Sequence, residues 1–318
     1  MPLHTSRRAQ IFTIALAGLL LMAMPVLAQG KGEPDPADRT PVPFLGGGPA
    51  DAFGHLIFDT SSGFCASNFI DISATGTPLT FTASGIFAAD DDGGAALTLA
   101  APFNFYGTDV TDVVVSTNGY VALGTTGGLA DEDGGDFNED CPLPATPSND
   151  FFTEARVMPF HNDLAGDGTG GSVFVEYFAS CPRTSEAGEE DCTIVMWDDW
   201  GLFGATGSYD LQAILYHQSG LMTYQYDDPG GLLDPTTAAV AIQNADATDA
   251  ATYSCAAAAT IDGNAVCIYT PTCSEPDCLG GGLGNNPFDP NIPTNSPVGL
   301  AVLAGLLGFF GLWLVRRR

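Results

Sequence analysis

Acidic side chains are the groups in this sequence best suited to chemistry, and the chemistry they suit is calcium binding. Three clusters stand out: residues 90–92, residues 131–140, and Asp163 with Asp167. Calcium takes about six to eight oxygen ligands from carboxylates and carbonyls on a turning loop, and these glycine-containing loops supply both. No cluster has EF-hand spacing, and simple solvated loops are the alternative. The best-supplied set of ligands is Asp131, Asp133, Asp136, Glu139 and Asp140.

A second candidate chemistry is hydrolysis. His161 precedes Asn162 and Asp163, and Asp198 and Asp199 precede a tryptophan. A hydrolase needs a nucleophile held by a base, or two carboxylates at a working separation. The chain has 4 His and contains no GxSxG or HExxH motif. We therefore expect His161 to be a structural hydrogen-bonding residue, and the chain to be no enzyme, with no catalytic residue and no cofactor beyond the calcium above.

Eight cysteines form a third set of reactive residues: Cys65, Cys141, Cys181, Cys192, Cys255, Cys267, Cys273 and Cys278. An even number in an exported chain predicts disulfides. Local spacing favours the pairs Cys181–Cys192, Cys255–Cys267 and Cys273–Cys278, which leaves Cys65–Cys141 by elimination. The alternative is a zinc site, but a Cys-x4-Cys spacing without a second close pair or a nearby His suits zinc poorly.

The charge balance excludes one class of partner. The chain has 38 Asp and Glu against 9 Lys and Arg, for a net charge of -29. Between the two ends, the basic residues are Lys31, Arg39, Arg156 and Arg183. Such a surface repels nucleic acid and anionic lipid, and it favours cations, basic partners or simple solubility. We expect no nucleic-acid partner.

The N-terminus predicts export. Arg7 and Arg8 precede an apolar run at 11–21, and small residues suited to cleavage follow at 26–28. This order is typical of a secretory signal peptide over residues 1–28, and an uncleaved anchor is the alternative.

The C-terminus predicts a membrane span. Residues 298–315 form an unbroken apolar run that is followed by three arginines. A helix of this length covers roughly 27 Å, enough for the hydrocarbon core of a bilayer. The arginines hold their end in the cytoplasm, which leaves the body of the chain outside.

This tail resembles the C-terminal sorting signals of Gram-negative bacteria, the IPTL-CTERM type in particular. The residues that carry the resemblance are Ile292, Pro293, Thr294, Ser296, Arg316, Arg317 and Arg318. Asn295 stands where that motif has Leu. The resemblance implies a sortase-like membrane protease as partner, which cuts near the motif and releases or transfers the protein to the surface. A plain membrane anchor is the alternative.

The body of the chain predicts strands. The stretch 97–124 contains a β-branched run, then Asn118-Gly119, then a second apolar run, which is a hairpin signal because tight primed turns need positive φ angles. Similar runs occur at 55–59, 68–73, 79–84, 95–105, 110–117, 120–124, 156–160, 172–178, 193–198, 208–217, 221–227, 238–243 and 264–269. We predict an all-β fold, a two-sheet antiparallel sandwich, with an N-terminal signal helix and a C-terminal transmembrane helix.

The predicted organisation follows from these elements. Its parts are a signal peptide (1–28), a Pro- and Gly-rich leader (29–50), a sandwich domain (51–272), a linker with the sorting motif (273–297), a transmembrane helix (298–315) and a cytoplasmic Arg cluster (316–318).

The body also resembles the nidogen-like modules of secreted bacterial and animal matrix proteins. The landmarks, in order, are Phe105-Tyr106-Gly107, Ser116 to Gly119, Asp163-Leu164, Trp197, and Gln212, Leu215, Gly220 and Tyr226, within about 97–245. The resemblance implies a non-catalytic extracellular module. We therefore expect an exported, membrane-tethered or surface-sorted protein in a cell-envelope, adhesion or matrix role. The alternative is a calcium- or glycan-binding module that uses the acidic loops and exposed aromatics such as Trp200 and Phe203.

Overall fold

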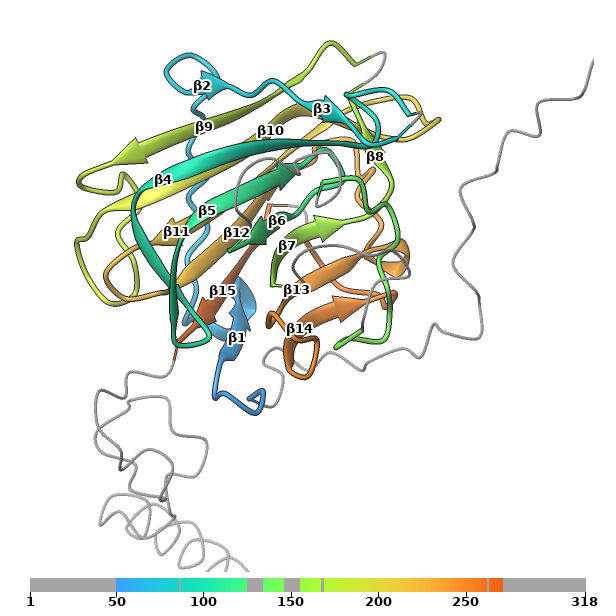
Figure 1. Cartoon of the computed structure of the whole chain (residues 1–318). Coiled ribbons are helices and arrows are strands. Elements are labelled where there is room, and N and C mark those ends of the chain that lie inside the picture. The colour runs from blue at the N-terminus through green and yellow to red at the C-terminus, as the bar shows by residue number, and fades with distance from the viewer. Residues whose placement is uncertain are drawn as a thin grey trace, which may run out of the picture. The chain divides into compact units, whose positions relative to one another are not determined.

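Two antiparallel sheets contain all the strands in the part of the chain that the computed structural model describes (Figure 1). The described residues are 50–85, 87–124, 134–145, 155–166, 169–261 and 263–270. The predicted signal peptide, sorting linker, transmembrane helix and Arg cluster lie outside these ranges. Among the described residues, no helix has the length and apolar character to cross a membrane.

The first sheet has the strand order β1-β15-β12-β11-β10-β9-β2, and β8 pairs with β10 beside it. Its strands are β1 (Leu56–Asp59), β2 (Thr77–Pro78), β8 (Leu164–Ala165), β9 (Ser172–Phe178), β10 (Cys192–Leu202), β11 (Tyr209–Tyr216), β12 (Met222–Asp227) and β15 (Ala265–Tyr269).

The second sheet has the order β14-β13-β7-β6-β5-β4-β3. Its strands are β3 (Thr82–Ala83), β4 (Gly93–Phe105), β5 (Thr108–Ser116), β6 (Val121–Leu123), β7 (Arg156–His161), β13 (Ala239–Gln243) and β14 (Ala250–Cys255). Two single-turn 3-10 helices, η1 (Thr60–Ser62) and η2 (Pro235–Thr237), complete the described elements.

The main core lies between the two sheets. Trp197 and Tyr224 come from the first sheet, and Val113 and Phe160 from the second, and all four are buried in one apolar cluster. Full burial of a side chain of this size stabilises a fold by about 1.5–3 kcal/mol. The predicted two-sheet sandwich is therefore confirmed for this part of the chain.

Each sheet is also covered on its outer face, which explains strands that are apolar on both sides. On the first sheet, Ile194 and Ile214 pack under Cys65 and Ile72 in a second apolar cluster. On the second sheet, a third cluster packs Val114, Tyr120 and Met158 under Cys141. We call 65–72 the first cover and 134–145 the second cover. Because both faces are shielded, Val113, Val114 and Val115 are all buried.

The predicted strand at 68–73 is wrong, because this segment is part of the first cover. Its backbone pairs with two buried glutamine side chains instead of a strand. Gln225 accepts a hydrogen bond from the Asn68 N–H (2.5 Å) and donates one to the Asn68 carbonyl (2.7 Å). Gln212 makes the equivalent pair with Ile70 at 3.4 and 3.1 Å. The amide side chains replace a strand-to-strand ladder.

Other boundaries also differ. The run at 79–84 contributes only the two residues of β3, and β14, β2 and β8 have no predicted counterpart. The remaining predicted strands all correspond to strands of the two sheets, with ends shifted by a few residues.

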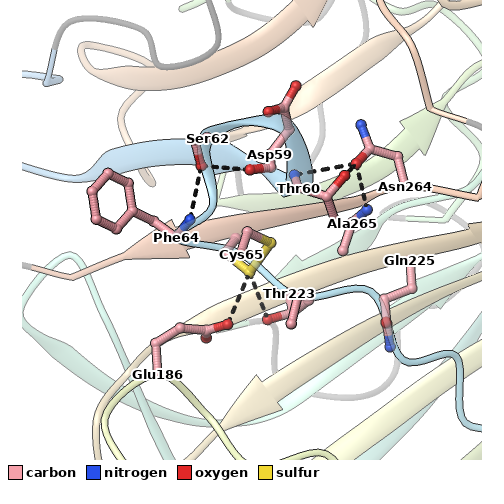
Figure 2. The surroundings of a disulfide bond; sticks show 12 residues. Asp59, Thr60, Ser62, Phe64, Cys65, Glu186, Thr223, Gln225, Asn264 and Ala265 are labelled. Atoms are coloured by element: carbon pink, nitrogen blue, oxygen red, sulfur yellow. Dashed lines mark hydrogen bonds between the residues drawn. A yellow bond between two sulfur atoms is a disulfide. The ribbon is translucent and has the colours of Figure 1, made fainter.

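The disulfides connect the covers to the sheets. Cys181–Cys192 is as predicted and closes the β9–β10 hairpin. The predicted pairs Cys65–Cys141 and Cys255–Cys267 are wrong. The bonds are Cys65–Cys267, which fastens the first cover to β15 (Figure 2), and Cys141–Cys255, which fastens the second cover to β14. Cys273 and Cys278 lie outside the described residues.

The hairpin at Asn118-Gly119 is confirmed, but its predicted two-residue primed turn is wrong. The Ser116 N–H donates to the Tyr120 carbonyl (2.9 Å), so the loop has three residues. Gly119 alone in this loop has a positive φ, at 73°. A three-residue loop that ends in a left-handed glycine is the next most common hairpin connection.

Candidate functional site

The loop between β5 and β6 is the point where the two sheets are joined by polar contacts. The indole N–H of Trp197 donates to the Ser116 carbonyl at 2.9 Å, and that of Trp200 donates to the Thr117 carbonyl at 2.9 Å. Both tryptophans belong to β10 of the first sheet and are buried. The loop is therefore held at a fixed position between the sheets.

The Asn118 side chain extends this arrangement to two further segments. Its Nδ2 donates to Asp92 Oδ1 at 2.9 Å, and its Oδ1 accepts from the Leu164 N–H at 2.9 Å. The Asn118 side chain is completely buried, so these contacts are shielded from water. One residue thus brings the acidic segment at 90–92 next to the segment that follows β7.

Three carboxylates meet at this junction. One oxygen each from Asp91, Asp92 and Asp163 lies within 4.8 Å of the others. Asp91 and Asp92 are buried, and Asp163 is partly exposed. The structure thereby unites two acidic clusters that are separate in the sequence. We call Asp91, Asp92 and Asp163 the acidic triad, and such carboxylate oxygens are the ligands that hard cations prefer.

The predicted calcium site at 131–140 has a different environment. Asp131 and Asp133 lie outside the described residues. Asp136 forms an ion pair with Arg156 at 2.5 Å, and both side chains are buried. The Arg156 guanidinium also lies 4.8 Å from the ring centre of Tyr120. Asp136 thus serves as the counter-ion of a buried arginine.

Two other predicted ligands accompany Asp136 in the second cover. Glu139 is buried, and Asp140 is partly exposed and has a positive φ of 48°. These residues lie beside the cover's disulfide cysteine, Cys141. The calcium prediction for 131–140 stays a prediction.

His161 lies in the same buried polar group. Its Nε2 is 3.2 Å from the Asp136 carbonyl oxygen, and its ring centre lies 4.6 Å from that of Tyr120. Burial lowers the pKa of His161 to about 4, against a smaller opposing effect of Asp136. The imidazole is therefore neutral at neutral pH and fastens the second cover to β7. These contacts are those of a structural residue.

The family model described as NIDO-related matches residues 63–272, which is more than half of the 318 residues. The chain belongs to the NIDO-related family. The match begins two residues before Cys65 and ends just after β15, so it takes in both covers. No curated protein and no solved structure shows significant similarity to the chain.

In this NIDO-related domain, the motif residues singled out from the sequence have internal roles. Trp197 and Asn118 join the sheets at the β5–β6 loop, and Gln212 holds the first cover. The hydroxyl of Tyr226 donates to the Pro159 carbonyl at 2.7 Å, which links β12 to β7. Gln225, the second glutamine of the cover, was missed. Its signal in the sequence is a polar residue between the two tyrosines of β12.

The exposed-aromatic prediction is half right for this NIDO-related domain. Phe203 is 46% exposed, but Trp200 is buried and cannot serve as a surface platform for a glycan. Gly166 lies against its ring, where an added Cβ would be 2.3 Å from the indole. Trp200 is a packing residue.

The bulge after Trp197 in β10 carries a second acidic group. Asp198 is partly buried, and burial together with the charges of Asp210, Asp199 and Asp71 raises its pKa to about 6. The pKa of Asp210 is also raised, mainly because of burial. The carboxylates at 198 and 199 predicted from the sequence therefore lie among like charges.

We expect Asp198→Asn to stabilise the domain at pH 7. The folded pKa lies above that of an unfolded aspartate, so ionisation costs stability as pH rises from about 4 to about 6. The amide removes this cost. The expected gain in the free energy of unfolding is about 1 kcal/mol or less, because solvent screens this partly exposed site. Denaturant unfolding at pH 7 and pH 3.5 measures the effect. A gain that is equal at both pH values would contradict it.

Proposed function

We propose that this NIDO-related domain is a non-catalytic module of an exported protein that acts in the cell envelope, at the cell surface or in the matrix. The proposal includes a C-terminal span as the initial anchor and a sortase-like protease as the processing partner. The span and the sorting motif are expectations from the sequence.

One observation carries the proposal: the polar motif residues are used to hold the sandwich together. Asn118, Trp197 and Gln212 are completely buried and bonded to backbone or carboxylate groups of other segments. The described disulfides add support, because three of them in one domain are typical of exported proteins. Family membership supports an extracellular setting.

Fractionation of a Gram-negative host that expresses the full chain tests localisation. We expect a product without residues 1–28 outside the cytoplasm, with a membrane-bound precursor and a shorter surface or medium form. Replacing Pro293 by Ala should leave the precursor in the membrane if the motif directs cleavage. Replacing Asn295 by Leu is the matched control and should preserve processing. A full-length product retained in the membrane in every variant would indicate a plain anchor.

Generic ester, peptide and glycoside substrates test the non-catalytic part. We expect no turnover above background by the purified domain. Turnover that is lost in Asp163→Ala would contradict the proposal, since Asp163 is the most exposed member of the acidic triad.

Calcium binding is the second candidate function, and the acidic triad favours it. The carboxylates of Asp91, Asp92 and Asp163 converge from two loops, so that three acidic groups lie close together. A bound cation would neutralise part of the negative charge gathered there. Because Trp200 is buried, the glycan-binding alternative lacks one of its two expected surface aromatics, and we do not propose it.

We expect millimolar calcium to raise the melting temperature of the domain relative to EDTA, because a ligand that binds only the folded state stabilises it. At 100 times its Kd the gain is about 2.7 kcal/mol. Asp163→Asn should abolish the shift, while Asp109→Asn, an exposed carboxylate on β5, should retain it. Scanning calorimetry supplies the measurement. An equal shift in both variants, or none in the wild type, would exclude the triad as a calcium site.

A further inference from the structure

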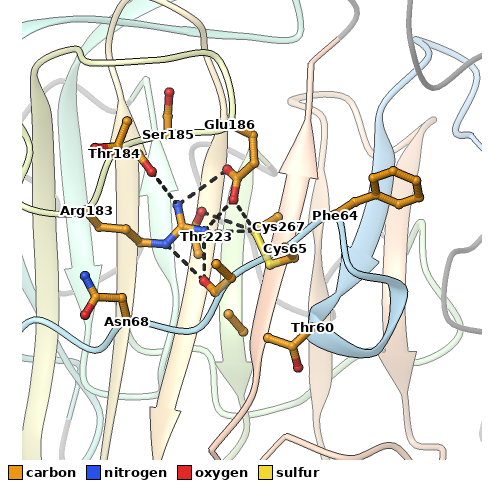
Figure 3. A network of polar contacts seen from close by, with 12 residues as sticks. Thr60, Phe64, Cys65, Asn68, Arg183, Thr184, Ser185, Glu186, Thr223 and Cys267 are labelled. Carbon is orange, nitrogen blue, oxygen red and sulfur yellow. Dashed lines mark hydrogen bonds and ion pairs between the residues drawn. A yellow bond between two sulfur atoms is a disulfide. The ribbon is translucent and has the colours of Figure 1, made fainter.

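The disulfide that fastens the first cover has an asymmetric polar environment (Figure 3). Arg183 Nη2 donates to Cys267 Sγ at 3.3 Å, and Thr223 Oγ1 donates to the same sulfur at 3.7 Å. Glu186 Oε1 lies 3.3 Å from it as well. Among the described residues, these polar side-chain contacts are all with the Cys267 sulfur and not with that of Cys65.

Arg183 is fixed in this position by several partners. It pairs with Glu186 at 2.5 Å, donates to the Tyr216 hydroxyl at 2.8 Å, and donates to the Ala66 carbonyl at 3.0 Å. Burial disfavours its charge, but the bonds to Glu186 and Tyr216 outweigh burial and raise the pKa of Arg183. A permanently charged donor is therefore held against one of the two sulfurs.

Both cysteines are buried, at 5% and 2% exposed, but the backbones that carry them differ. Cys267 belongs to β15, which is paired on both sides by β1 and β12. Cys65 lies in an irregular segment whose neighbours Phe64 and Ala66 are exposed. Strand pairing therefore constrains the backbone of Cys267 on both sides, whereas Cys65 lies outside any strand.

We propose that Cys65–Cys267 is a thiol–disulfide exchange site, in which Cys65 is the sulfur attacked and Cys267 is the sulfur that leaves. The co-reactant is a dithiol. Its thiolate forms a mixed disulfide with Cys65, the Cys65–Cys267 bond breaks, and the electron pair goes to Cys267 Sγ as a thiolate. The second thiol of the co-reactant, as its thiolate, then displaces Cys65. The protein gains two electrons and protons as the dithiol becomes a disulfide.

The two donors to Cys267 Sγ, Arg183 and Thr223, fit this direction, and the Glu186 carboxylate opposes it. A nearby guanidinium stabilises a thiolate and lowers its pKa, and a sulfur with a lower pKa leaves faster. The Thr223 hydroxyl supplies a second donor. The opening frees the first cover at one end, above the apolar outer face formed by residues such as Ile194 and Ile214. The exchange site thus controls exposure of that face.

Mapping of a monothiol adduct tests the proposal. The oxidised, folded full chain is exposed to reduced glutathione, free thiols are trapped with iodoacetamide, and peptides are assigned by mass spectrometry. We expect glutathione on Cys65 and the alkyl group on Cys267, in about tenfold excess over the reverse. Near-ultraviolet circular dichroism confirms that the fold persists. Adduct chiefly on Cys267, an equal mixture, or no adduct in the folded state would each overturn the proposal.

Two substitutions separate this chemistry from simple exposure of the bond. Glu186→Gln removes a carboxylate that competes for Arg183, so exchange should become several-fold faster with adduct still on Cys65. Thr223→Val removes a donor without changing side-chain shape, so exchange should become slower. Cys181–Cys192 in the same samples is the internal control and should react at an unchanged rate. Unchanged rates at Cys65–Cys267 in both variants would also overturn the proposal.

Discussion

Gly119→Val is expected to abolish folding and secretion of the domain. A Cβ at residue 119 would lie 2.1 Å from the Phe160 carbonyl oxygen and 2.8 Å from Leu164 Cδ1. The clash is with the backbone of β7, which cannot turn away as a flexible side chain can. The positive φ adds a further cost for any residue with a Cβ, and valine, with a branched Cβ, suffers most. We expect a loss of at least about 4 kcal/mol.

Gly231→Val is the matched control. Its φ is also positive, at 64°, but an added Cβ would meet nothing within 4 Å. This variant bears only the backbone cost of about 1–2 kcal/mol and should be secreted. Secreted yield and thermal melting of both variants provide the comparison. Wild-type melting of the Gly119 variant would mean that the loop assignment is wrong.

Removal of the Cys141–Cys255 disulfide is also expected to destabilise the domain strongly. The bond closes a loop with a sequence separation of 114 residues, so its loss restores about 5 kcal/mol of chain entropy to the unfolded state. It also loosens the second cover, which supplies the Asp136 partner of buried Arg156. An arginine that loses its buried partner adds to the cost. The double variant Cys141→Ala/Cys255→Ala avoids an unpaired thiol.

The comparison is with Cys181→Ala/Cys192→Ala, which opens a loop with a separation of only 11 residues. The same entropy argument gives about 3 kcal/mol for this bond. Denaturant unfolding of the two double variants measures the difference. A loss at Cys181–Cys192 as large as that at Cys141–Cys255 would contradict the expected order.

The strands were the most predictable part of the fold, because their signals are local. The β-branched run at Val113–Val115 and the hairpin at Asn118-Gly119 are readable within a few residues. The turn type could not be predicted locally. Asn118 uses its side chain to bond Asp92 and Leu164, and its backbone does not have the positive φ of a primed turn. The covers escaped prediction for a related reason. Apolar residues at 68–73 look like a strand when the partners of their backbone are distant glutamines.

The disulfide pairings also divide into one that local sequence predicts and two that depend on distant segments. Cys181 and Cys192 bracket one hairpin, and proximity in sequence was enough. Cys65 and Cys141 each lie in a cover, so their partners are set by which sheet the cover lies on. The acidic triad was equally hidden. Asp92 and Asp163 are neighbours only because the β5–β6 loop draws both segments to Asn118.

The burial of both arginines has a consequence for the lifetime of the folded domain. From residue 50 to residue 270, Arg156 and Arg183 are the only Lys or Arg in the sequence, and their side chains are 2% and 3% exposed. Proteases that cut after basic residues must thread such a side chain into a deep acidic pocket. In the folded domain both are engaged with Asp136 and Glu186. The sandwich should therefore survive trypsin-like digestion outside the cell until it unfolds.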